Sequence, residues 1–241
     1  MPMLKSLILA VLLVLPPALP AQTAKPASAE PAPAKAEPQV LLQTSEGNIT
    51  LELYPDKAPK SVANFLQYVR DGFYDGTVLH RVIPGYLVQG GLYTRELQPK
   101  TTRPAIPSEA DNGLSNLRGT IAVARGVDPD SGTAQFFFNL VDNRRLDFVG
   151  NQSGLTWGFA VFGKVTQGMD VLDKIATLPT RALGPFAGDV PKPLVVIESA
   201  RIIEPNTPAS GSSAAAAGKP ASTKAAAGKP ARKTAKHAAK G

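Results

Sequence analysis

Few side chains in this sequence could carry out covalent or metal-dependent catalysis. The chain has no cysteine, which excludes thiol catalysis, disulfides and cysteine-ligated metal sites. It has two histidines, His80 and His237, and the second lies in a low-complexity tail, so a His-rich metal site is also excluded. His80 could still serve a serine triad, but the sequence lacks a G-x-S-x-G nucleophile motif and a phosphate-binding G-x-x-x-x-G-K-[ST] motif. We therefore expect no metal and no cofactor.

The most informative stretch is residues 79–91, which read LHRVIPGYLVQGG. This stretch resembles the signature FHRVIPGFMxQGG of cyclophilin-type peptidyl-prolyl cis-trans isomerases. A second block, residues 134–139 (AQFFFN), resembles the SQFFI block of the same family, and shorter matches follow in the family's order over nearly all of 40–204. The resemblance is closest to the exported bacterial members. It implies a mainly β fold, a closed eight-stranded antiparallel β-barrel capped by two α-helices.

The reaction that this family catalyses suits a chain without nucleophiles. Rotating an X–Pro bond breaks amide resonance against a barrier of ~18–20 kcal/mol, and no covalent bond is formed or cleaved. The site needs an apolar slot for the proline ring and a hydrogen-bond donor for the proline nitrogen, whose lone pair becomes localised as the bond twists. Arg81 is our candidate for this donor. An isolated arginine in a strand would ordinarily be a solvated or salt-bridged surface group.

The remaining site residues are implied by the resemblance. Gln89 and Gln135 match the family's two glutamines, one of which supports the arginine while both line the peptide groove. Ala124 and Arg125 lie in the stretch whose backbone pairs with substrate as an added strand. His80 is expected to be structural, because strand alternation directs it away from the face of Arg81. The positions that match the proline pocket, which could also be ordinary barrel core, are Tyr86, Leu87, Phe137, Leu146 and Phe159.

The sequence departs from the family pattern at several of these positions. Leu87 replaces the usual methionine and Tyr86 the usual phenylalanine, and both changes keep the pocket apolar. Arg125 replaces an asparagine whose contact is made mainly through its backbone, so little harm is expected. Arg145 stands where eukaryotic members have the tryptophan that hydrogen-bonds cyclosporin, which predicts weak cyclosporin binding. Phe159 replaces the histidine of eukaryotic members, as in exported bacterial ones.

The elements that must position these residues can be read from hydrophobic periodicity. Val62, Phe65, Leu66 and Val69 recur with the spacing of one helix face, with Pro59 in the first turn. A second helix is predicted at 169–178. Short alternating or apolar runs predict strands at 40–44, 49–54, 78–82, 86–89, 120–124, 135–140, 159–164 and 194–203.

Both ends of the chain differ in composition from the domain at 40–204. Residues 1–21 have the layout of a secretory signal, with Lys5 followed by a nine-residue apolar run that is too short to span a bilayer. Residues 22–39 form an Ala/Pro-rich linker, and 205–241 a basic Ala/Lys/Pro-rich tail that is expected to be disordered. Seven of the 26 basic residues and none of the 19 acidic residues follow Glu204, so the tail accounts for the net charge of +7.

Two functions from different classes fit this sequence. The first is an exported, periplasmic prolyl isomerase, expected to be monomeric, that acts on proline-containing polypeptides. The second is a non-catalytic proline-binding or chaperone module tethered by its tail. The retained Arg81, Gln89 and Phe137 favour the enzyme. The tail is either a solubilising extension or a tether to an anionic envelope polymer or membrane surface.

Overall fold

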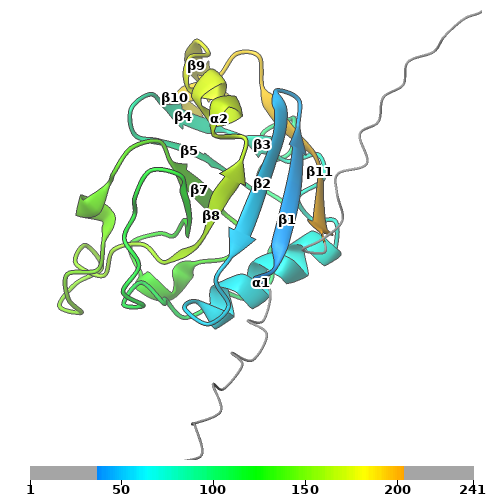
Figure 1. Ribbon diagram of the computed structural model, residues 1–241. Helices are drawn as coiled ribbons and strands as arrows, with labels where there is room; N and C mark the ends of the chain where they lie inside the picture. The colour runs from blue at the N-terminus through cyan, green and yellow to red at the C-terminus, as the bar shows by residue number, and fades with distance from the viewer. Residues whose placement is uncertain (1–36, 204–241) are drawn as a thin grey trace, which may run out of the picture.

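A computed structural model describes residues 37–203, which fold around one antiparallel sheet (Figure 1). The predicted signal peptide, most of the predicted linker and the basic tail lie outside the described residues. The sheet is ordered β3-β11-β1-β2-β8-β6-β7-β5-β4. Its strands are β1 (Gln39–Thr44), β2 (Gly47–Leu53), β3 (Val78–Leu79), β4 (Arg81–Ile83), β5 (Leu87–Gly90), β6 (Thr120–Val123), β7 (Phe136–Asn139), β8 (Val161–Gln167) and β11 (Val195–Ile203).

The two ends of this sheet nearly meet, so it forms a barrel. Strand β3 pairs with β11 and β4 pairs with β5, and only His80 separates β3 from β4 in the chain. If β3 and β4 are counted as one interrupted strand, eight strands surround the core. The predicted eight-stranded antiparallel barrel is confirmed, except that the expected single strand at 78–82 is broken at His80.

Two helices complete the barrel, as predicted. Helix α1 (Pro59–Arg70) begins with proline at its first position, and helix α2 (Met169–Ala176) follows β8 directly. They lie toward opposite ends of the barrel in Figure 1. Helix α1 buries Val62, Phe65 and Leu66, and the Phe65 ring lies 5.6 Å from Phe136, edge to face. Such burial anchors the helix more strongly than its intrinsic propensity would.

Most apolar side chains of the strands fall into two clusters, one inside the barrel and one on its outer face. The barrel interior holds the larger cluster, which includes Leu42, Leu51, Val82, Val88, Ile121, Phe136, Phe138 and Phe162. The alternate positions face outward, because successive side chains of a strand point to opposite faces of the sheet. On β5, β6, β7 and β8 these outward positions build a second cluster, described below.

One element was not predicted from the sequence. Residues 180–191 form a two-stranded hairpin, β9 (Thr180–Leu183) and β10 (Phe186–Pro191), outside the barrel sheet. The hairpin contacts β4, which carries Arg81. Within residues 37–203, no helix is both long and apolar enough to cross a membrane.

Candidate active site

The strand register places the predicted chemical residues in one line across the outer face of the barrel. Arg81 on β4 pairs with Gln89 on β5, Gln89 pairs with Phe137 on β7, and Phe137 pairs with Ala122 on β6. Since neighbouring strands lie about 4.8 Å apart, the backbones of Arg81 and Phe137 are separated by about 10 Å. That distance is about the length of three extended residues. A short peptide could therefore contact both ends of this cross-strand row.

An apolar surface surrounds the Phe137 end of the row. The outer apolar cluster consists of the buried Leu87, Ala122, Ala124, Phe137 and Val161 and the partly buried Tyr86, Leu114, Leu146 and Phe159. The rings of Phe137 and Phe159 meet edge to face, with centroids 5.5 Å apart. The structure thus brings together all five residues that the resemblance assigned to a proline pocket.

The polar end of the row consists of Arg81 and two glutamines. The Arg81 side chain is 42% exposed, and its Nε lies 3.5 Å from a carboxylate oxygen of Asp189 on β10. Gln89 does not hydrogen-bond to Arg81 in the described part of the chain. Its Nε2 donates instead to Oε1 of Gln135 at 3.1 Å, and the Gln135 carbonyl accepts the Ala124 N–H at 3.0 Å. Gln135 therefore connects the middle of the row to the backbone at Ala124.

Comparison with known proteins assigns the chain to a family. The family model described as cyclophilin type peptidyl-prolyl cis-trans isomerase matches residues 39–202. The chain belongs to this family.

Individual relatives agree with the family match. Peptidyl-prolyl cis-trans isomerase A of Dickeya dadantii is 52% identical over 165 residues, which cover 68% of this chain and 84% of the relative. Peptidyl-prolyl cis-trans isomerase B of Escherichia coli is 48% identical over 165 residues, which cover 68% of this chain and 99% of the relative. The crystal structure of a cyclophilin from Cryptosporidium parvum shares the fold, with a TM-score of 0.58 and 22% sequence identity. The match covers 70% of this chain and 98% of the Cryptosporidium chain. The predicted family, fold class and isomerase assignment are thus confirmed.

Arg125 of this cyclophilin uses its side chain more than the sequence analysis expected. Its Nε and Nη2 donate to the carbonyl of Gly158 at 3.0 and 2.6 Å, and Nη2 also donates to the carbonyl of Gly154 at 2.7 Å. The guanidinium also lies 4.8 Å from the centroid of the Phe159 ring. Partial burial lowers the pKa of Arg125, but the group stays charged at neutral pH. Arg125 thus fixes the 154–158 segment next to the outer apolar cluster.

Three buried asparagines behind the outer apolar cluster were not identified from the sequence. Asn116 donates to the carbonyls of Leu146 at 3.1 Å and Phe159 at 3.2 Å. Asn143 donates to the carbonyl of Tyr86 at 2.9 Å, and Asn139 donates to the side chain of Asn116 at 3.2 Å. These bonds hold three backbone segments that carry pocket residues. Single asparagines, two in loops and Asn139 at the end of β7, carry no periodic signal, so sequence reasoning had no means of finding them.

His80 is buried against the β9–β10 hairpin, whereas Arg81 is half-exposed, in agreement with the prediction of a structural histidine. It is 2% exposed, it stacks on Phe186 at a centroid distance of 5.0 Å, and it meets Tyr93 at 4.7 Å. Burial is the main cause that lowers the pKa of His80 from 6.5 to about 4, and the positive charge of Arg81 acts in the same direction. His80 is therefore neutral at neutral pH, and its Nδ1 has no hydrogen-bond partner within residues 37–203.

Arg145, a departure from the family pattern, adds positive charge beside the outer apolar cluster. The Arg145 guanidinium lies 4.7 Å from the centroid of the Tyr86 ring, so a cation covers a residue of the outer apolar cluster. The Trp157 ring packs edge to face on Phe148, with centroids 5.4 Å apart.

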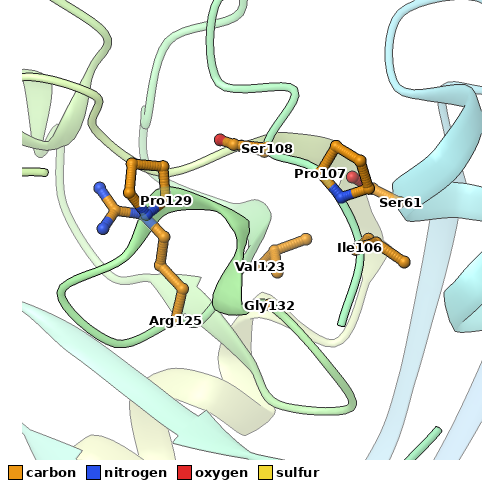
Figure 2. A pocket seen from close by; sticks show the side chains of 9 residues that line it. Ser61, Ile106, Pro107, Ser108, Val123, Arg125, Pro129 and Gly132 are labelled. Atoms are coloured by element: carbon orange, nitrogen blue, oxygen red, sulfur yellow. The ribbon is translucent and has the colours of Figure 1, made fainter. Parts of the chain in front are cut away.

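A small pocket beside Arg125 is distinct from the outer apolar cluster. Figure 2 shows Arg125 and Pro129 at one side of it and Ile106 and Ser61 at the other. It offers about 10 Å³, which is room for about one water molecule and too little for a proline ring.

Proposed function

We propose that this cyclophilin accelerates X–Pro rotation by placing the proline ring on the outer apolar cluster and the Arg81 guanidinium beside the twisting bond. The observation that carries the proposal is the cross-strand row, which joins a half-exposed cation to a buried phenylalanine on one face. The two X–Pro isomers differ by only about 0.5–1 kcal/mol in peptides, so the catalyst has to act on the barrier alone. Contacts that bind the twisted bond more tightly than either planar isomer lower this barrier.

The two ends of the row have separate tasks in this mechanism. Phe137, Leu87 and Phe159 offer apolar surface to the proline ring and exclude water from the bond. Excluding water lowers the local dielectric constant, which strengthens the attraction between the guanidinium and the localised lone pair of the proline nitrogen. Gln89 and Gln135 offer amide groups between these ends, where they contact the peptide backbone.

The substrate backbone pairs with residues Ala124 and Arg125 as an added strand in this proposal. The polypeptide leaves β6 at Val123, and the Ala124 N–H is already bonded to Gln135, which fixes this stretch beside the pocket. A Cryptosporidium cyclophilin with the same fold was crystallised in the presence of the dipeptide Ala-Pro. This supports proline-containing polypeptides as the substrate class of this chain.

The test compares the full chain with its Arg81→Ala variant in catalysed cis-to-trans isomerisation of a proline peptide. We expect kcat/KM to fall on the order of 100-fold, the usual cost of removing one donor to the transition state. Arg103→Ala is the matched control, since Arg103 is also half-exposed and paired with one aspartate, and it lies outside the row. If neither the wild type nor the variant exceeds the uncatalysed rate while both bind the peptide, the barrel is a binding module. If Arg81→Ala keeps full activity, the role of Arg81 is wrong.

We further propose that the enzyme is exported to the bacterial periplasm and acts there on exported proteins. Lys5 and the apolar run at 7–15 support this proposal, and fractionation of cells that express the full chain tests it. A second expectation concerns the basic tail, which would attract an anionic envelope polymer or membrane surface. Binding to such a polymer that survives deletion of 205–241 would contradict the tether.

A further inference from the structure

Apolar contacts hold the β9–β10 hairpin against the barrel. Leu183 and Phe186 pack against a small cluster of Val78, Leu97 and Val196. Phe186 also stacks on His80, which is the residue before Arg81. The position of the hairpin relative to β4 is therefore set by buried rings and aliphatic groups.

The hairpin places one carboxylate on the face where Arg81 lies. The register of β9 and β10 is irregular between Phe186 and Val190, and Asp189 lies in this irregular stretch with a φ of +64°. Residues with a Cβ rarely adopt this left-handed conformation. The next residue, Val190, is fully buried, so the backbone on that side of Asp189 is anchored. An unfavourable backbone conformation thus coincides with the residue that contacts Arg81.

The contact itself leaves most of the guanidinium free. The Asp189 carboxylate approaches Nε of Arg81 at 3.5 Å, and no hydrogen bond described within residues 37–203 uses either Nη atom. Both groups are nearly half-exposed, at 42% and 46%, so the pair adds little to stability. A carboxylate near Nε instead restricts rotation of the guanidinium plane while both Nη groups remain available to a substrate.

We propose that Asp189 is a positioning residue for Arg81, delivered by the β9–β10 hairpin to orient the guanidinium toward the cross-strand row. This inference rests on the proposed role of Arg81 in catalysis. The resemblance implies that one of the two glutamines supports the arginine, but in the structure Gln89 and Gln135 are bonded to each other. Asp189 is accordingly the only hydrogen-bond partner of the Arg81 side chain in the described part of the protein.

The test uses the full chain and its Asp189→Asn variant. Asparagine has the same shape and tolerates a left-handed backbone, so this change removes the charge with little effect on the hairpin. We expect kcat to fall by about fivefold with little change in KM, because a misoriented donor weakens the transition state more than substrate binding. Asp189→Gly relieves the backbone and removes the carboxylate, so it should show at least the same loss while folding at least as well.

Two further readouts separate positioning from a structural effect. The NMR order parameter of the Arg81 Nε–H should fall in Asp189→Asn, while that of Arg118 should not. Asp173→Asn, which breaks the Arg118–Asp173 pair of similar exposure, is the matched control and should leave kcat unchanged. In an Arg81→Lys background, Asp189→Asn should have no additional effect, since lysine lacks the Nε donor.

The outcomes distinguish this inference from the proposed function. If Arg81→Ala is inactive but both Asp189 variants match the wild type, only the positioning role is wrong. If Asp189→Asn lowers kcat by the same factor in the wild-type and Arg81→Lys backgrounds, its effect is structural and the inference is also wrong. If Arg81→Ala is fully active, the proposed mechanism fails and this inference fails with it.

Discussion

Replacing His80 with phenylalanine should remove much of the acid sensitivity of this cyclophilin's stability. The imidazole is buried between Phe186 and Tyr93, and its pKa is lowered to about 4 by burial. Phenylalanine keeps a ring in the same stack and has no proton to bind. The unpartnered Nδ1 means that no hydrogen bond from that atom is lost on substitution.

The size of the effect follows from the difference in pKa between the folded and unfolded chain. Between pH 6.5 and about 4 the unfolded chain binds a proton at His80 that the folded protein does not bind. The free energy of unfolding therefore falls as the pH is lowered through this window. For one such group the loss between pH 7 and pH 5 is about 2 kcal/mol.

Urea unfolding at pH 7 and pH 5 measures this loss in both proteins. Carboxylates also titrate toward the lower pH, but they are the same in both proteins, so their contribution cancels in the difference between them. We expect the wild type to lose about 2 kcal/mol more than His80→Phe over this interval. Equal losses in the two proteins would show that His80 is protonated as easily in the folded state as in the unfolded one, and would refute the link between its burial and acid sensitivity.

Other predictions concern the rim of the pocket. Arg125→Ala should destabilise the protein by about 2 kcal/mol in urea unfolding, because charged hydrogen bonds to two carbonyls are lost. Amide hydrogen exchange within 150–158 should also become faster. Unchanged exchange there would contradict the proposal that Arg125 holds this segment. Gly158→Ala should destabilise by more than about 2 kcal/mol, measured by urea unfolding, because Gly158 has a φ of +63° and an added Cβ would lie 2.5 Å from the Asp147 carbonyl carbon. In a competition titration, cyclosporin should bind the wild type weakly and the Arg145→Trp variant more tightly. The substitution replaces the cation over Tyr86 with an indole that can donate a hydrogen bond. Tight binding by the wild type would contradict this prediction.

The fold could be predicted from the sequence where burial is one-sided and periodic. Helix α1 combined an apolar face at Val62, Phe65, Leu66 and Val69 with a proline at its start, and the structure has it at Pro59–Arg70. The strand predictions fell within a few residues of the observed bounds for the same reason, because one face of each strand is buried in the barrel.

The β9–β10 hairpin could not be predicted by this reasoning. The first three residues of β9 are exposed, and the turn contains Gly184 and Pro185, which are typical of loops. Leu183 and Phe186 pack against the body and Val190 is fully buried, but these residues are separated by three and four positions and do not alternate as a regular strand would. The register irregularity before Val190 removes the alternation that would have indicated β10.

The candidate site was predictable only where family-like sequence blocks encoded it, as the 134–139 block does for Gln135 and Phe137. Arg81, Tyr86, Leu87 and Gln89 fall within a single signature. Their polar support does not: Asp189 is 108 residues from Arg81 along the chain, and Asn116 is 30 residues from Leu146. Contacts at such separations depend on how the barrel closes, and single polar residues leave no pattern that reveals them.

On β7, three consecutive phenylalanines are divided between the barrel core and the candidate site, which are one residue apart along the strand. Phe136 and Phe138 are buried in the barrel interior, whereas Phe137 is equally buried but lies in the outer apolar cluster beside Gln89. Composition and burial cannot distinguish the three, and only the alternation of the strand does. A one-residue slip of β7 would exchange their roles and place two core rings on the outer face. Because a buried interior makes such a slip costly, the packing that stabilises the barrel also keeps Phe137 in line with Arg81.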